Sequence, residues 1–278
     1  MASKIITAIK YLAINICGHK LSQTLLEKNV AYSHYLMGIG AGSSVVFSGE
    51  KVILKLLGKM YIEKNRSLCV FDVGTNKGQF LSLIISGLGN IPFVAHSFEP
   101  SLHTYKLLSE NIISRENVYL NNFGLGKKTG YYTLYYDNIG SGSASLTRRR
   151  LSHIGVEFKY SELVRIDTID NYCLTNGIRE IDFLKLDVEG HELDVLAGAE
   201  KMVEENRIKM ISFEFGGCNI DTRTFFQDFW YFFKGIGMYI YRITPSGRLV
   251  KIEKYKELYE QFRTTNYIAT QSTILGVH

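Results

Sequence analysis

Hydrophobic residues along the chain form short apolar runs that alternate with stretches of helical spacing. Five runs rich in β-branched and aromatic residues predict buried strands at residues 68–73, 93–98, 118–123, 181–187 and 208–215. After the first run, Phe80, Leu83, Ile84 and Gly87 recur at i, i+3, i+4 and i+7, which predicts one face of a helix. Strands that alternate with helices indicate a mainly parallel sheet with helices on both faces.

Two further runs, at 238–243 and 266–270, predict a late antiparallel pair at one edge of the sheet. The expected fold is therefore α/β, a doubly wound sheet of seven strands with an antiparallel edge hairpin. Extra short strands are expected at 130–136 and 163–166. Helix-like segments at 4–26 and 50–64 flank a glycine- and serine-rich patch at 38–44. We expect residues 1–66 to form an N-terminal helical extension, and 67–278 to form the main domain.

A glycine-containing turn follows the first strand and has the pattern D-x-G-x-x-x-G, from Asp72 through Gly74 to Gly78. Glycine lets the backbone approach a ligand closely, and a helix N-terminus offers free N–H groups. The pattern differs from the dinucleotide fingerprint G-x-G-x-x-G and resembles motif I of S-adenosylmethionine-dependent methyltransferases. Asp72 would help to hold the cationic methionine portion of that cofactor. Asn76 and Gln79, in and after the turn, are further cofactor-binding candidates, and so is Asp187 at the end of the fourth strand.

Acidic and amide residues also follow the other predicted strands. Glu99, followed by Pro100, lies 27 residues after Asp72, where an acid is placed to accept hydrogen bonds from ribose hydroxyls. Asn122 and Phe123 end the third strand, where an adenine edge would lie. The fourth and fifth strands lead into a set of titratable residues, namely Asp187, Glu189, His191 and Glu214. Ligands bind outside the carboxyl ends of the strands in open α/β sheets, so these strand ends predict one site.

Five segments in order together resemble the FkbM-type methyltransferases, over roughly residues 67–216. They are Asp72-Val73-Gly74-Thr75-Asn76-Lys77-Gly78, Phe98-Glu99-Pro100, Ser145-Leu146, Lys185-Leu186-Asp187-Val188-Glu189-Gly190-His191-Glu192 and Phe213-Glu214-Phe215. The resemblance implies a class I methyltransferase (Rossmann-like) fold and methyl transfer from S-adenosylmethionine to a hydroxyl oxygen. It also implies a small-molecule acceptor, typically a sugar or a polyketide-like molecule.

The methyl group of a sulfonium is already activated, so the protein must position an alcohol and remove its proton. His191 is the natural base, because its ordinary pKa lies near neutrality. Its alternative role is structural, either capping the following helix or lying in the core with its hydrogen bonds satisfied. Asp187, Glu189 and Glu214 would orient the acceptor or assist the base, and Asp187 with Glu214 offers oxygen ligands suited to Mg²⁺. The His191 segment does not read HExxH, which excludes a zinc protease on pattern.

Composition adds few constraints. The chain of 278 residues is 46% apolar with three prolines, which is typical of a folded protein. Its four cysteines show no CxxC pair, which favours a reducing compartment, here the cytoplasm, and argues against a zinc module. The sequence contains no run of 18 apolar residues, so no membrane-spanning helix is expected. We expect the first helix-like segment to pack against the domain, and the lysines around it give contact with a membrane surface as the alternative. The small-residue loop 140–146 is either a linker or a lid beside the cofactor.

The net charge of +5 is mild, and Arg148–Arg150 is the tight basic run. This run is either a solvated face or a docking site for an anionic partner. The main expectation is an O-methyltransferase acting on a small glycan or glycosylated metabolite, without a specific nucleic-acid partner. The alternatives are a methyltransferase acting on RNA or protein, a non-catalytic S-adenosylmethionine-binding module, and an NAD-dependent oxidoreductase, which the missing G-x-G-x-x-G disfavours. The absence of Pro-Pro and Pro-Cys pairs excludes exocyclic-amine and cytosine-C5 methylation on pattern.

Overall fold

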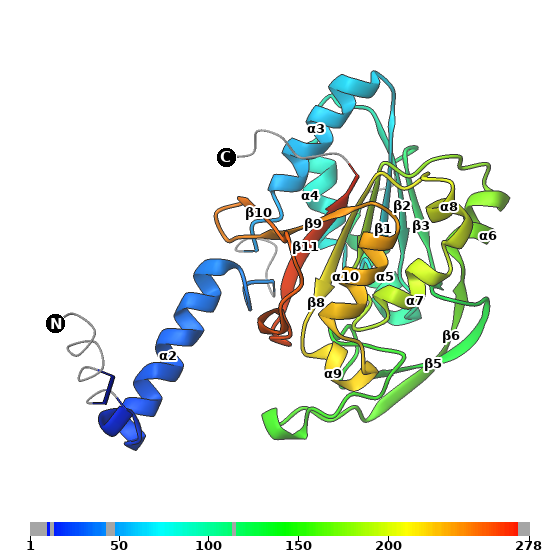
Figure 1. Ribbon diagram of the computed structural model, residues 1–278. Coiled ribbons are helices and arrows are strands. Elements are labelled where there is room, and N and C mark those ends of the chain that lie inside the picture. Colours follow the sequence, from blue (N-terminus) through cyan, green and yellow to red (C-terminus); the bar gives the residue numbers. More distant parts are fainter. Residues whose placement is uncertain (1–9, 12–13, 43–47, 113–114, 272–278) are drawn as a thin grey trace.

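The centre of the protein is one large mixed sheet, seen in a computed structural model that describes residues 10–11, 14–42, 48–112 and 115–271 (Figure 1). Its strands lie in the order β10-β9-β11-β8-β7-β1-β2-β3. They span Leu68–Val73 (β1), Phe93–Phe98 (β2), Val118–Asn121 (β3), Phe183–Leu186 (β7), Met210–Phe215 (β8), Tyr239–Ile243 (β9), Leu249–Lys251 (β10) and Thr265–Thr270 (β11). The five strands from β8 to β3 are parallel, and β11 is antiparallel to both of its neighbours.

The predicted doubly wound α/β sheet is confirmed, with two differences at its antiparallel end. The sheet has eight strands within the described residues rather than seven, because Leu249–Lys251 pairs with β9 as an additional edge strand. The two predicted late strands are antiparallel to each other, as expected, but the later one, β11, is inserted between β8 and β9. The hairpin at the edge is therefore β9–β10.

Helices cover both faces of the sheet and create two hydrophobic cores. The helices of eight or more residues are Lys20–Met37 (α2), Val52–Lys64 (α3), Gln79–Gly87 (α4), Leu102–Asn111 (α5) and Phe226–Gly235 (α10). The shorter ones are Ile169–Thr175 (α6), Glu192–Ala197 (α7), Glu200–Glu204 (α8) and Cys218–Thr222 (α9), with 3-10 turns at Ser152–Ile154 (η1) and Glu257–Tyr259 (η2). Side chains of α3, α4 and α5 share one core, and those of α6, α7, α8 and α10 share the other.

A second, three-stranded sheet accounts for the extra strands that the alternating pattern predicts. Its order is β4-β6-β5, with bounds Gly124–Leu125 (β4), Gly130–Tyr136 (β5) and Tyr160–Asp167 (β6). Leu134, Val164 and Ile166 form its own small core. Because β4 begins three residues after β3 ends, this sheet stands beside the carboxyl ends of the parallel strands.

The region before β1 differs from the predicted helix boundaries. The expected helix at 4–26 falls partly on residues outside the described ranges, and the described helix α2 continues to Met37. It ends there because Gly38 adopts a φ of 91°, which favours glycine. None of the described residues of α2 is buried, whereas Val52, Ile53, Leu56 and Leu57 of α3 join the core. A domain boundary at residue 66 stays a prediction.

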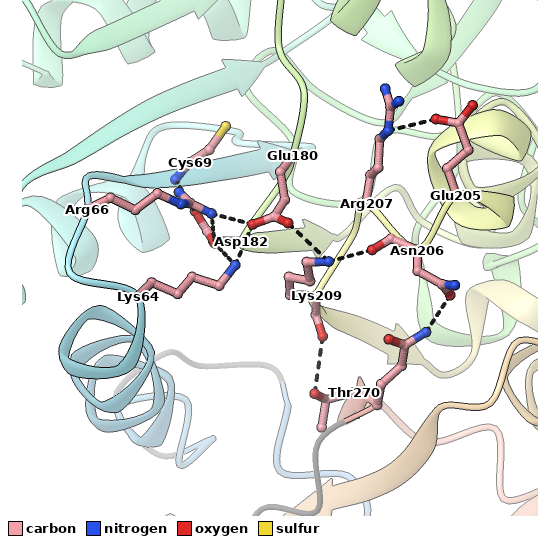
Figure 2. Close-up of polar contacts among 11 residues, drawn as sticks. Lys64, Arg66, Cys69, Glu180, Asp182, Glu205, Asn206, Arg207, Lys209 and Thr270 are labelled. Atoms are coloured by element: carbon pink, nitrogen blue, oxygen red, sulfur yellow. Dashed lines mark hydrogen bonds and ion pairs between the residues drawn. The ribbon is translucent and has the colours of Figure 1, made fainter.

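A cluster of charges ties the end of α3 to the amino end of β7 (Figure 2). Asp182 is fully buried and accepts hydrogen bonds from Lys64 Nζ at 2.6 Å, from the Arg66 guanidinium at 2.8 and 2.9 Å, and from Cys69 N at 2.8 Å. Glu180 pairs with the same Lys64 and Arg66. The cluster thus fixes α3 to the sheet at the end opposite to the predicted site.

Among the described residues, no helix is both long enough and apolar enough to cross a bilayer. All four cysteines are free thiols, in agreement with the absence of a CxxC pair.

Candidate active site

The glycine turn after β1 packs tightly against the loop that follows β7. Gly74 has a φ of 82°, and a Cβ placed on it would lie 1.8 Å from the Asp187 carbonyl oxygen. Gly78 has a φ of 88° and is the N-cap of α4. The backbone N–H groups of Gly74 and Thr75 donate to the carbonyl of Phe98 at the end of β2. The sequence requires glycine at position 74 because neither a left-handed backbone nor this contact tolerates a side chain.

Asp72 lies buried beneath this turn. Among the described residues, neither of its carboxylate oxygens has a hydrogen-bond partner. Burial raises the pKa of Asp72 to about 6, and the nearby Lys185 opposes this shift. Burial disfavours the charge of Lys185, but Asp187, Asp72 and Glu50 outweigh that effect and raise the pKa of Lys185. The Lys185 ammonium lies 2.7 Å from Asp187 Oδ2, so Asp72 remains a buried acid without a donor of its own.

Glu99 connects the end of β2 to the glycine turn. Its carboxylate accepts hydrogen bonds from Asn76 N and Ser101 N, both at 3.0 Å. Burial raises the pKa of Glu99 to about 7, although these two hydrogen bonds favour the charged form. Glu99 is thus placed at the predicted strand end, where it also orders the turn.

The two predicted adenine contacts, Asn122 and Phe123, contact other parts of the protein. The Asn122 amide donates to the carbonyls of Glu99 and Pro100, at 3.1 and 3.2 Å. Phe123 packs its ring against Phe98 and Tyr172. Neither lines the pocket described below, where the wall after β3 is built by Gly124 and Leu125 instead. Their role in cofactor binding stays a prediction.

Three carboxylates converge where β7 and β8 end. The carboxylate oxygens of Asp187, Glu189 and Glu214 lie within 4.8 Å of one another. Burial, followed by the charge of Asp187, raises the pKa of Glu189 to about 8 and raises that of Glu214 well above its usual range. Like charges this close stay ionised together only when a cation compensates them. The predicted option of a metal at Asp187 and Glu214 therefore gains Glu189 as a third oxygen donor.

Arg149 supplies one compensating charge that the sequence did not reveal. Its guanidinium lies 2.6 Å from Glu189 Oε2, and its Nε lies 3.6 Å from Asp221 Oδ2. Arg149 therefore points into the site, although the run Arg148–Arg150 gave only the alternatives of a solvated face and a docking patch. Its inward direction depends on the path of a loop between β5 and β6, which local spacing does not encode.

His191 is held at both ring nitrogens. Its Nδ1 lies 2.8 Å from Asp194 Oδ2, and its Nε2 lies 3.0 Å from Thr147 Oγ1. The hydrogen bond from His191 lowers the pKa of Asp194, so this carboxylate stays charged and accepts the Nδ1 proton. This arrangement assigns the tautomer whose Nε2 accepts a proton. The side chain of His191 makes no cap hydrogen bond to α7. The loop between β7 and α7 is held instead by Glu192, whose carboxylate accepts hydrogen bonds from Val188 N and Gly190 N.

Two adjoining cavities meet at this cluster. The inner pocket contains the glycine turn, the second strand end and the His191 loop, and its lining includes Gly74, Asn76, Glu99, Pro100, Gly124, Leu125, Leu134, Ala144, Leu146, Ile166, Asp187, Glu189 and His191. Ser141, Gly142 and Ser145 also line it. The small-residue loop is therefore part of the pocket wall.

The outer cleft, of about 1310 Å³, shares Gly74, Asn76, Gly142, Asp187 and Glu189 with the inner pocket. Its other lining residues include Gly78, Gln79, Lys185, Glu214, Arg149, Gly40, Gly42, Glu50, Arg263, Thr264 and Asn266. Residues far from the strand ends thus build one wall. Glu50 is buried, and burial raises its pKa while Lys185 opposes this shift. An acid in the region before β1 carried no sequence signal for the site.

Comparison with known proteins gives one family match. Residues 72–242 match the profile of the methyltransferase FkbM domain, which is more than half of the chain. A comparison with curated protein sequences found no match.

Solved structures with a similar fold are distant. A methyltransferase FkbM from Methylobacillus flagellatus KT is 16% identical with a TM-score of 0.44, over 73% of this chain and 43% of that one. The present chain thus spans less than half of that protein's length. The plantazolicin methyltransferase BamL, in complex with a triazolic desmethylPZN analog and SAH, is 10% identical with a TM-score of 0.43, over 81% of this chain and 86% of that one. A putative methyltransferase from Thermoplasma acidophilum is 12% identical with a TM-score of 0.33, over 78% and 75%.

Proposed function

The chain belongs to the family of the methyltransferase FkbM domain, a class that uses S-adenosylmethionine, and from this premise we propose that it is an O-methyltransferase. The acceptor that we propose is a hydroxyl group of a sugar, a glycan or a glycosylated small molecule. The observation that carries the proposal is the orientation of His191, whose Nδ1 is held by Asp194, in a pocket wall that also contains the glycine turn and Glu99.

The donor side of the site suits S-adenosylmethionine. Asp72 is a buried carboxylate without a hydrogen-bond donor, beside the turn where the cationic methionine portion would lie. Glu99 has a carboxylate at the second strand end, where ribose hydroxyls would donate to it. Gly74, Asn76, Gly78, Gln79 and Pro100 complete the cofactor-binding set that we propose, and they line one or both cavities.

The sulfonium of the bound cofactor supplies an activated methyl group. His191 Nε2 would take the proton of the acceptor hydroxyl as the new carbon–oxygen bond forms and the carbon–sulfur bond breaks. Asp194 holds the ring by Nδ1 and stabilises the charge that His191 gains. The hydroxyl of Thr147 occupies the hydrogen-bonding position on Nε2 that an acceptor hydroxyl would take. The roles of Asp187, Glu189 and Glu214 would be to receive hydrogen bonds from the acceptor.

The outer cleft favours a polyol over a phosphate-rich partner. Glu50, Asp187, Glu189 and Glu214 put four acids in its lining, and carboxylates accept hydrogen bonds from hydroxyl groups. Of the cations in the same lining, Arg149 is engaged by Glu189 and Lys185 by Asp187, rather than open to the phosphates of RNA. We therefore propose a glycan, and not RNA, as the acceptor. A Mg²⁺ ion is the further component that Asp187, Glu189 and Glu214 would accommodate. A cytoplasmic location accords with the four free thiols.

The test begins with calorimetric titration of the purified protein with S-adenosylhomocysteine, with and without Mg²⁺. Micromolar binding is expected, and its absence in both conditions would overturn the proposal. Transfer of labelled methyl groups is then measured with nucleotide sugars and glycans, and with RNA and protein fractions as competitors.

The variant His191→Asn should lower turnover by about 10²–10⁴-fold and leave S-adenosylhomocysteine affinity unchanged, because only the base is lost. The matched control is His153→Asn, which changes an exposed histidine on η1. Wild-type turnover in His191→Asn would refute the role of His191. Labelling confined to RNA or protein would refute the glycan acceptor while the methyltransferase class stands.

A further inference from the structure

Helix α2 exposes an unusual amount of apolar surface. Leu21 is 81% exposed, Leu25 is 67% exposed, and Tyr32 and Leu36 are also largely open to solvent. In Figure 1 the helix projects away from the sheet. It is attached at its end, where the Met37 carbonyl accepts a hydrogen bond from Arg242 Nε at 2.8 Å. A helix that only linked two parts of the fold would not need these side chains, since exposed apolar patches commonly mark interaction surfaces.

Four of the exposed apolar residues of α2 share one face of the helix, while Leu26 and Val30 are exposed on other sides. Leu21, Leu25, Tyr32 and Leu36 recur at i, i+4, i+11 and i+15, which places them in a stripe along the helix axis. The opposite face carries the polar residues Gln23, Glu27 and His34 together with Val30. Lys28 lies beside the stripe, where its long stem can lie along an apolar surface while its ammonium stays in a polar layer.

The charge of this region identifies the partner. Residues 1–37 contain four lysines (Lys4, Lys10, Lys20 and Lys28) and one acid, Glu27, so that this short part carries most of the net charge of +5. Two copies of such a helix would repel each other, whereas an anionic lipid surface attracts it. Tyrosine is also enriched at the boundary between lipid headgroups and acyl chains. The described helices cannot span a bilayer, which leaves an arrangement in the plane of the membrane.

We propose that α2 is a peripheral membrane anchor that lies in the headgroup layer of an anionic bilayer. Leu21, Leu25, Tyr32 and Leu36 enter the acyl boundary, and Lys20 and Lys28 contact anionic headgroups. Gly40 and Gly42 follow the helix directly and line the outer cleft. The anchor therefore holds the mouth of the cleft close to the membrane surface. This proposal does not depend on the reaction that the site performs.

The experiment is co-sedimentation of the full chain with vesicles of phosphatidylcholine alone and of phosphatidylcholine with one third phosphatidylglycerol. Binding is expected to the anionic vesicles and to weaken as salt is raised. The double variant Leu25→Asn/Leu36→Asn should bind at least about tenfold more weakly. The variant Lys20→Gln/Lys28→Gln should lose about thirtyfold.

Matched controls change residues of the same types elsewhere. Gln23→Asn/His34→Asn alters the polar face of α2, and Lys254→Gln/Lys256→Gln removes two exposed lysines far along the chain. Both should bind as the wild type does, and circular dichroism should show that every variant is folded. Failure to bind anionic vesicles would overturn the proposal, as would equal binding by the stripe variant. A dimer in sedimentation equilibrium that Leu25→Asn/Leu36→Asn dissolves, without vesicle binding, would assign the stripe to a second copy instead.

Discussion

Replacing Asp182 with alanine is predicted to destabilise the fold by about 3 kcal/mol. The side chain is 0% exposed and receives hydrogen bonds from Lys64, Arg66 and the Cys69 backbone. Removing one partner of a buried ion pair costs ~3–5 kcal/mol, because the remaining charge stays desolvated. Glu180 remains beside Lys64 and Arg66 in the variant and compensates part of that loss, so we expect the lower end of the range.

The assay is reversible urea unfolding with thermal melting as a second readout. A loss of 3 kcal/mol corresponds to a drop in Tm of about 6–12 °C for a chain of this size. The control is Glu205→Ala, which removes the pair between Glu205 and Arg207 at 2.6 Å, shown in the same view (Figure 2). Both side chains of that pair are about half exposed, so its loss should cost ~0–1 kcal/mol. Equal destabilisation by the two variants would refute the argument that burial, and not the presence of an ion pair, sets the energy.

Three further predictions concern the site and the pH dependence. Gly74→Ala should weaken S-adenosylhomocysteine binding by more than about tenfold, because its Cβ would collide with the Asp187 carbonyl, and unchanged calorimetric affinity would contradict this. Affinity for the same ligand should fall as pH drops below about 7, since protonated Glu99 no longer accepts two hydroxyl hydrogen bonds, and Glu99→Gln should remove this dependence on pH. Partial burial disfavours the charged form of Glu180, but its hydrogen bonds and ion pairs with Lys64 and Lys209 outweigh this effect. They lower the pKa of Glu180 from 4.5 to about 2. Its contribution to stability is thus present above pH 4.5 and lost as pH falls toward 2, so urea unfolding of wild type and Glu180→Gln should converge in acid; a constant difference would count against the assignment.

The strand ends were predictable from the sequence because their signal is local. Asp72, Glu99, Asp187 and Glu214 each lie at the end of an apolar run or directly after it, and the rule for open α/β sheets places such ends at one edge. The structure brings Asp187, Glu189 and Glu214 together accordingly. The eighth strand was missed because Leu249–Lys251 is short and has a weak pattern.

Other parts of the site depend on tertiary contacts that periodicity does not carry. Arg149 stands in a run of three arginines, and only the loop path selects it to face Glu189. Asp194 lies three residues after His191 on a short helix, a spacing that would have suggested a contact had the helix start been known. Glu50 reaches the cleft from a region outside the matched family segment, so no motif pointed to it.

The insertion of β11 between β8 and β9 has a consequence for synthesis. Strand β11 supplies the hydrogen bonds for one edge of β8 and one edge of β9, although it follows both of them in the chain. Until then, a nascent chain presents two unpaired strand edges, which are templates for intermolecular pairing. Thr264 and Asn266 also complete the wall of the outer cleft. Pairing of β11 thus closes two open strand edges and completes one wall of the outer cleft in the same step, and a chain interrupted before residue 265 would keep both edges open.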